Sequence, residues 1–258
     1  MGGIGEFDAI TLDKMLAGKN ISMTPTISAL QEGFTGSSTP KDLETMFQLL
    51  YLYGTAPRKD AQAFQAFHER MSSMLKQRDA APETAMRDTL QTTMAQYHLR
   101  ARPMKIDMLD NISLDKAYDF YKDRFGDFSD FNFFIVGNID MKQMRDMVET
   151  YIASLPSTNR NEKWKDLGIM PPKGMITKSV YKGVEPKSSV SINITGPFEW
   201  NAKNRFNLQA MAEVLSIKLR ETLREEKGGV YGVGARATPT HYPREQYQLT
   251  ISFGCSPE

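Results

Sequence analysis

The stretch Arg224-Glu-Glu-Lys-Gly-Gly-Val-Tyr231 joins the end of a long amphipathic helix to the start of a strand. Two glycines bend the backbone between the arginine and the tyrosine, so both side chains can point into one pocket and donate hydrogen bonds to a carbonyl. Arginine keeps its proton near neutral pH, and tyrosine loses its proton only when it is strongly perturbed. The stretch therefore indicates a group that grips a substrate and is not by itself a catalyst.

The residues around this stretch predict an α+β unit. A helix over about 202–225, with Asn201 as its N-cap, should cover a sheet with the face formed by Leu208, Met211, Leu215, Leu219 and Leu223. Apolar alternation predicts four strands in this part of the chain, at Met175–Tyr181, Ser189–Ile194, Val230–Thr238 and Glu245–Phe253.

The first part of the chain predicts mainly packing helices. Helices are expected over 8–17, after the caps Thr39, Asp60, Ser113 and Asp140, and over about 81–98. Strands are expected at Ile21–Leu30 and, as a buried apolar run, at Phe131–Val136, and Glu32–Pro40 is rich in turn residues. A polar and proline-containing stretch predicts domains at 1–156 and 175–258, with a linker at 157–174.

Composition bounds the class of protein. With 258 residues, 40% hydrophobic and 24% charged, the chain is an ordinary globular one that can hold two cores. The 32 basic and 31 acidic residues leave a net charge of +1, which argues against nucleic-acid partners. No apolar run is long enough to span a membrane, and the N-terminus lacks the pattern of a signal peptide. Cys255 is the single cysteine, so it forms no internal disulfide or thiolate metal cage.

Candidate metal ligands are scattered. The three histidines, His68, His98 and His241, lie far apart in the sequence. His68-Glu-Arg-Met-Ser72 opens like the H-E-x-x-H zinc motif but carries Ser72 where the second ligand belongs. We therefore predict no metal site, no catalytic residue and no cofactor in this chain. On residue physics alone, a packing interpretation of the opening stretch is also available. Arg224 would pair with a neighbouring carboxylate such as Glu221, Gly228-Gly229 would end the helix in left-handed geometry, and Tyr231 would pack at the sheet edge.

Several segments, in this order and spacing, resemble the C-terminal, non-catalytic half of bacterial zinc peptidases of the insulinase/pitrilysin family, whose zinc motif is of the inverzincin type. The resemblance covers nearly the whole chain and rests on Gly3–Asp8, Leu16–Lys19, Glu32–Ser37, Leu43–Leu50, Phe134–Asp140, Ser154–Pro156 and Arg224–Val233. It implies two similar α+β domains with an antiparallel or mixed sheet covered by helices: a third domain without its first strands and the first part of a fourth, so both are truncated.

The resemblance also implies a function. The zinc, held by an inverted H-x-x-E-H motif, is expected in the N-terminal half of the parent protein. Arg224 and Tyr231 match the arginine and tyrosine that contact the substrate backbone beside that zinc. The expected partners are a peptide or unfolded polypeptide substrate and an N-terminal catalytic half or catalytic partner subunit. Because many bacterial relatives are exported, the periplasm is the expected compartment.

Two other functions stay open from the sequence. Some relatives have lost zinc and serve as peptide-recognition or structural subunits of larger assemblies, and this chain would have the same fold in that role. A helical interaction scaffold unrelated to peptidases is the third hypothesis, and it would require the resemblance to be accidental.

Overall fold

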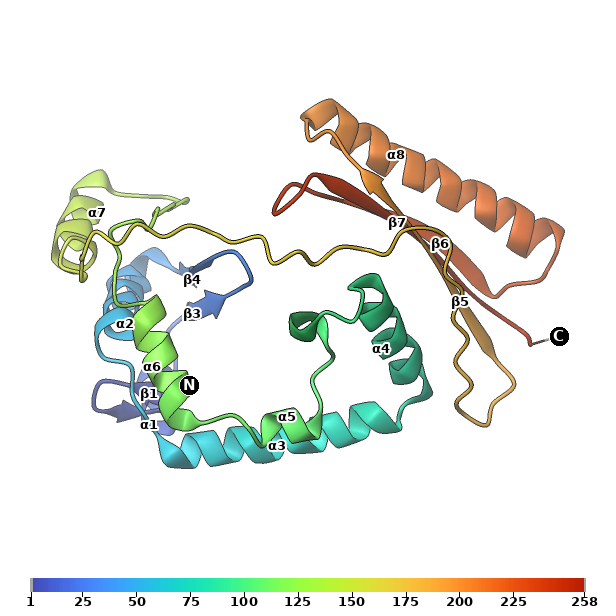
Figure 1. Cartoon of the computed structure of the whole chain (residues 1–258). Helices are drawn as coiled ribbons and strands as arrows, with labels where there is room; N and C mark the ends of the chain where they lie inside the picture. The colour runs from blue at the N-terminus through green and yellow to red at the C-terminus, as the bar shows by residue number, and fades with distance from the viewer. Residues whose placement is uncertain (1, 258) are drawn as a thin grey trace. The chain divides into compact units, whose positions relative to one another are not determined.

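The computed structural model describes residues 2–257 and divides into two compact units. Unit 1 holds the residues up to Ala80 together with Met104–Lys165, and unit 2 holds Ala81–Pro103 together with the residues from Asp166 onward. Figure 1 shows the helices and strands of each unit. Helices and antiparallel sheets occur in both, so the predicted α+β class is confirmed. The predicted division into domains 1–156 and 175–258 stays a prediction.

Unit 1 is mainly helical, with two small antiparallel hairpins. The strands are β1 (Gly3–Ile4) paired with β2 (Phe7–Asp8), and β3 (Ile21–Ile27) paired with β4 (Glu32–Ser38). The helices are α1 (Ala9–Leu16), the 3-10 turn η1 (Pro40–Asp42), α2 (Leu43–Thr55), α3 (Ala61–Ala80), α5 (Ile106–Leu109), α6 (Leu114–Arg124), α7 (Met141–Met147) and the π-helical η3 (Val148–Ile152).

Side-chain caps begin several of these helices. The oxygens of Asp60, Ser113 and Asp140 each accept a hydrogen bond from a backbone N–H in the first turn of α3, α6 and α7, as the sequence predicts. Each cap satisfies a donor that a helix N-terminus otherwise leaves without a partner. The caps therefore fix where these helices start.

An aromatic cluster forms part of the core of unit 1. Phe125 is 1% exposed, and its ring centroid lies 4.6 Å from that of Phe34 and 4.7 Å from that of Tyr121. Phe128 and Leu155, both buried, pack in the same cluster. Because Phe34 belongs to β4 and Tyr121 to α6, the cluster ties a hairpin to a helix.

The buried carboxylate of Asp127, next to this cluster, connects two segments of unit 1. Asp127 is 4% exposed and accepts hydrogen bonds from the backbone N–H groups of Ser129, Thr158 and Arg160 and from the Thr158 hydroxyl. The Thr158 hydroxyl and these N–H groups hold the pKa of Asp127 well below its usual range, since they favour the charged form. Asp127 thus fixes the turn after α6 to residues 158–160.

Two predictions for unit 1 are wrong. Phe131–Val136 forms no strand among the described residues, and the side chains of Phe134 and Val136 are 89% and 97% exposed. Glu32–Pro40 is largely strand β4, because its backbone pairs along β3 from Ile27 to Ile21. Small residues such as Gly33 and Ser37 resemble a turn in sequence, but small side chains are also tolerated in a two-stranded ribbon whose backbone pairs fully.

Unit 2 contains a three-stranded antiparallel sheet and a long helix along one of its faces (Figure 1). The strand order is β5-β7-β6, so β7 lies in the centre. The elements are α4 (Pro82–Met94), the 3-10 turn η2 (Leu99–Ala101), β5 (Ser188–Pro197), α8 (Ala202–Leu219), the π-helical η4 (Arg220–Glu226), β6 (Gly232–Thr240) and β7 (Gln246–Cys255).

The two faces of this sheet differ in polarity. Ile194, Leu249 and Ala237 stand in one row across the three strands, on the face with the buried Leu249. The next row, Thr195, Gln248 and Thr238, points to the other face because side chains alternate along a strand. One face is thus apolar, and the other carries hydroxyl and amide groups together with the exposed Arg236.

The predicted elements of unit 2 are confirmed in part. The helix and three of the four strands form, but Met175–Tyr181 forms no strand among the described residues, and Met175 and Tyr181 are 97% and 95% exposed. Met211 is 41% exposed, whereas Ala212 and Ser216 are buried. Leu208, Leu215, Leu219 and Leu223 are half-buried, so the covering face of α8 combines four of the five predicted residues with these two small ones.

The helix predicted over 81–98 ends early, at Met94. Gln96 and Tyr97 have φ values of 49° and 58°, which are left-handed and cannot continue a right-handed helix. The Tyr97 N–H donates to the carbonyl of Thr92 and closes the helix end. This turn orients Gln96 toward the segment at Met170.

Candidate functional site

The candidate site begins where α8 changes from an α-helix into the wider π-helix η4. Asn201 caps α8, as the sequence predicts, by accepting a hydrogen bond from the Asn204 N–H at 2.7 Å. After Leu219 the helix continues as the π-helical η4, in which the Lys227 N–H donates to the carbonyl of Thr222, five residues back. Such π segments are rare and are frequent at functional sites. Arg224 lies in this widened turn.

A glycine then reverses the backbone. Gly228 has a φ of +61°, the left-handed conformation that commonly ends a helix, and its N–H donates to the carbonyl of Arg224. The Tyr231 N–H donates to the carbonyl of Gly254 in β7 at 3.2 Å. Both ends of the stretch are therefore fixed by backbone hydrogen bonds.

The side chains of Arg224 and Tyr231 are exposed. Tyr231 is 83% exposed, and within residues 2–257 neither side chain makes a hydrogen bond or an ion pair. Glu221, which the packing interpretation pairs with Arg224, instead pairs with Lys218 at 2.8 Å. The packing interpretation is wrong for both side chains, although Gly228 does end the helix as it predicted.

The stretch can donate hydrogen bonds and attract a partial negative charge. The guanidinium of Arg224 offers several N–H donors and a permanent positive charge, and the Tyr231 hydroxyl offers one donor. A carbonyl oxygen, or the oxyanion that forms from it, is the natural partner for such a pair of donors.

The described residues hold no group of three or more His, Cys, Asp or Glu side chains that could bind a metal ion. His68 in α3 lies 3.3 Å from an oxygen of Asp110, and His241 lies 3.1 Å from an oxygen of Glu245 without the alignment of a hydrogen bond. Each of these two histidines contacts a single carboxylate.

In residues 2–257 no helix has both the length and the apolarity needed to cross a membrane.

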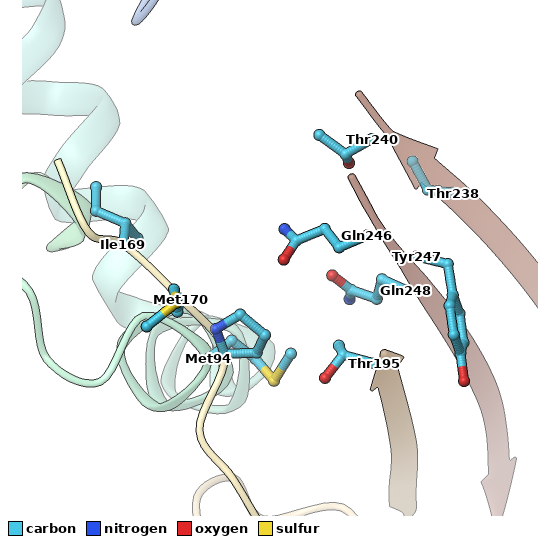
Figure 2. Close-up of a pocket in the computed structure, with 10 residues that line it drawn as sticks. Met94, Ile169, Met170, Thr195, Thr238, Thr240, Gln246, Tyr247 and Gln248 are labelled. Atoms are coloured by element: carbon cyan, nitrogen blue, oxygen red, sulfur yellow. The ribbon is translucent and has the colours of Figure 1, made fainter. Parts of the chain in front are cut away.

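Unit 2 also contains a pocket of about 170 Å³ on the polar face of the sheet, which the sequence did not predict. Figure 2 shows Thr195, Gln246 and Gln248 pointing toward Met94 on the facing wall. The signal was present as hydroxyl and amide side chains at alternate positions of the three strands. It could not be used because the pairing register that gathers them is a tertiary property.

Comparisons with known proteins identify the family. Residues 111–258 match the family described as Peptidase M16 inactive domain. A probable zinc protease PqqL from Haemophilus influenzae is 26% identical over 259 aligned positions, which cover 99% of this chain and 27% of that protein. The chain spans about a quarter of the length of the curated relatives it matches.

Solved structures share the fold. The periplasmic protease PqqL from Escherichia coli superposes with a TM-score of 0.86 at 19% identity, covering 99% of this chain and 28% of that one. A peptidase M16 inactive domain from Pseudomonas fluorescens superposes with a TM-score of 0.75 at 14% identity, covering 100% and 62%. These likenesses confirm the resemblance to insulinase and pitrilysin peptidases. The family match covers more than half of this chain. The chain therefore belongs to the Peptidase M16 inactive-domain family, the non-catalytic domain of zinc proteases.

Proposed function

We propose that this chain supplies peptide-substrate binding and chamber closure to a zinc metalloendopeptidase and does not cleave peptides alone. The observation that carries the proposal is the stretch from Arg224 to Tyr231. Its backbone is fixed at both ends, while both functional side chains are exposed and have no partner within residues 2–257. Groups held in place without internal partners are available to a ligand.

The two side chains have separate roles in the proposal. The Tyr231 hydroxyl donates to the carbonyl oxygen of the peptide bond and stabilises the negative charge that develops there. Arg224 holds the neighbouring backbone carbonyls of the substrate and keeps the peptide in register. The family implies zinc, but a zinc site needs at least three protein ligands, and the described residues offer no such group. In this proposal the zinc belongs to the N-terminal half of the parent protein, as the family resemblance implies.

The partner and the compartment follow from the relatives. The curated relatives are about four times longer than this chain, which supports an N-terminal catalytic half as the partner. One structural neighbour is described as a periplasmic protease, which supports the periplasm for this chain as well. Both assignments are part of the proposal.

The test is cleavage of a fluorogenic peptide by the zinc-bearing half together with this chain. Tyr231→Phe should lower kcat by about a hundredfold or more, because one oxyanion donor is lost. Arg224→Ala should lower kcat/KM as well. Tyr181→Phe is the matched control, because Tyr181 is also exposed in unit 2 and lies outside the stretch.

The variants should fold like the wild-type chain. Truncating exposed side chains usually changes the free energy of unfolding by no more than about 0.5 kcal/mol. A rate that is the same for Tyr231→Phe and Tyr181→Phe would remove the assigned role. If this chain binds the catalytic half and leaves cleavage unchanged, the zinc-free peptide-recognition function takes its place.

A further inference from the structure

The pocket on the polar face of the β5-β7-β6 sheet has two unlike walls. The sheet wall presents hydroxyl and amide side chains from all three strands, and the facing wall is formed by Met94 and by residues 169–171. In Figure 2 the ring of Tyr247 points away from the pocket, in agreement with its place on the apolar face. All of these residues belong to unit 2.

The sheet wall has unused hydrogen-bonding capacity. Within residues 2–257, the side chains of Thr195, Thr238, Thr240 and Gln246 make no hydrogen bond. The fifth polar side chain of this wall, Gln248, is bonded to the next row along the same face: its Nε2 donates to Asn193 Oδ1 at 3.0 Å, and the Thr250 hydroxyl donates to the same oxygen at 2.9 Å. Four of the five threonine and glutamine side chains that line the pocket are therefore open to a ligand, and Gln248 is already bonded.

The facing wall is apolar and is tied down. Gln96 Nε2 donates to the carbonyl of Met170 at 3.1 Å and lies 3.4 Å from that of Pro171. Arg244 pairs with Asp166 at 2.7 Å, which anchors the same segment to the β6–β7 hairpin. Methionine side chains such as Met94 adapt to apolar groups of different shape. This wall can receive one apolar side chain.

Charge and size restrict the ligand. Among the residues that the structure describes, no charged side chain belongs to the lining of the pocket, and the exposed Arg236 lies one row outside it on the same face. An ion buried inside the pocket would therefore have no charged partner in the lining. Its volume of about 170 Å³ is below the roughly 300–1,000 Å³ of sites that enclose whole small molecules. The occupant should therefore be one uncharged part of a longer ligand.

We infer that this pocket binds an uncharged, extended stretch of polypeptide. One apolar side chain of the ligand packs on Met94 and Met170, and its backbone N–H and C=O groups bond to Gln246 and to the threonine hydroxyls. The inference rests on the proposed function in that the ligand is a peptide. The pocket is nevertheless a separate surface, since Thr238 lies roughly 24 Å along the strand direction from Tyr231.

The experiment measures binding of labelled, end-blocked peptides to the full 258-residue chain by fluorescence anisotropy. One peptide contains only Ala, Leu, Ser and Gln, and the second carries two Glu in its centre. Wild-type chain should bind the neutral peptide about tenfold more tightly than the acidic one. Gln246→Glu should weaken binding of the neutral peptide about tenfold, because a carboxylate repels backbone carbonyls and donates nothing.

Two further variants separate a binding role from a structural one. Gln246→Lys should reverse the preference and favour the acidic peptide, which a merely destabilised chain would not do. Gln209→Glu is the matched control, because Gln209 is exposed on α8 and away from the pocket. Circular dichroism checks that each variant is folded.

A failure of the pocket inference can be distinguished from a failure of the role assigned to Tyr231. The inference is wrong if folded wild-type chain binds neither peptide at about 1 mM, or if Gln246→Glu binds like Gln209→Glu. In either case a rate loss in Tyr231→Phe would leave the proposed function standing. If instead Tyr231→Phe has no effect on cleavage while the Gln246 variants change binding as described, the pocket stands and the role of Tyr231 fails.

Discussion

Phe125 and Phe134 are a matched pair for testing where unit 1 buries its apolar surface. Phe125 is 1% exposed and packs against Phe34 and Tyr121, so Phe125→Ala should cost about 3–5 kcal/mol through lost burial and the cavity left behind. Phe134 is 89% exposed, so Phe134→Ala should change the free energy of unfolding by no more than about 0.5 kcal/mol. The chemistry of the two changes is identical.

The assay is urea unfolding of the full chain followed by tryptophan fluorescence. The chain has two tryptophans, Trp164 in unit 1 and Trp200 in unit 2. In a Trp200→Phe background the remaining tryptophan is Trp164, which is 54% exposed and belongs to unit 1, so the fluorescence follows that unit. The midpoint for Phe125→Ala should fall strongly at an unchanged slope, while the midpoint for Phe134→Ala should match the parent.

One result would refute this reasoning. If Phe134→Ala lowers the free energy of unfolding by more than about 2 kcal/mol, the side chain is buried. The strand that the sequence predicts at Phe131–Val136 would then form in solution, and the exposed path of this segment would be incorrect.

Two other perturbations test the surroundings of this core. Gly54→Ala should destabilise unit 1 by about 1–3 kcal/mol, because the new Cβ would lie 2.6 Å from Phe128 Cζ and this overlap outweighs the better helix propensity of alanine; a gain in urea-unfolding stability would contradict this. The pKa of Asp127 is lowered by folding from its ordinary 3.8, so its contribution is complete above that pH and is lost as the pH falls further. Asp127→Asn should therefore lower the Tm at pH 7 and flatten its decrease between pH 4 and pH 2, and parallel Tm–pH curves would argue against the assigned hydrogen bonds.

Local signals in the sequence predicted the helices well. The caps at Asp60, Ser113 and Asp140 and the apolar spacing that follows them are decided within a few residues, and the structure has these helices. The strands were less predictable because pairing depends on partners far along the chain. Phe131–Val136 has the composition of a buried strand but no partner strand among the described residues, whereas Glu32–Ser38 lacks that composition and pairs fully.

The two candidate sites also differ in how far the sequence could predict them. Arg224 and Tyr231 were found because they are close in sequence and resemble a family pattern, and their exposure supports the assignment. The pocket was not found, because Thr195, Thr238 and Gln246 come together only through the register of β5, β6 and β7. A sequence carries no mark that separates these residues from other polar strand positions.

The π-helical turn before Gly228 also bears on how relatives should be aligned. A turn closed by i→i+5 hydrogen bonds contains one residue more than an α-helical turn. A relative that lacks one residue between its arginine and its tyrosine can therefore end its helix in the α form and still bring both groups to the same places. The spacing of seven positions from Arg224 to Tyr231 is thus one of at least two spacings that place the two side chains alike. Alignments across this family should allow a single gap there without treating the pair as lost.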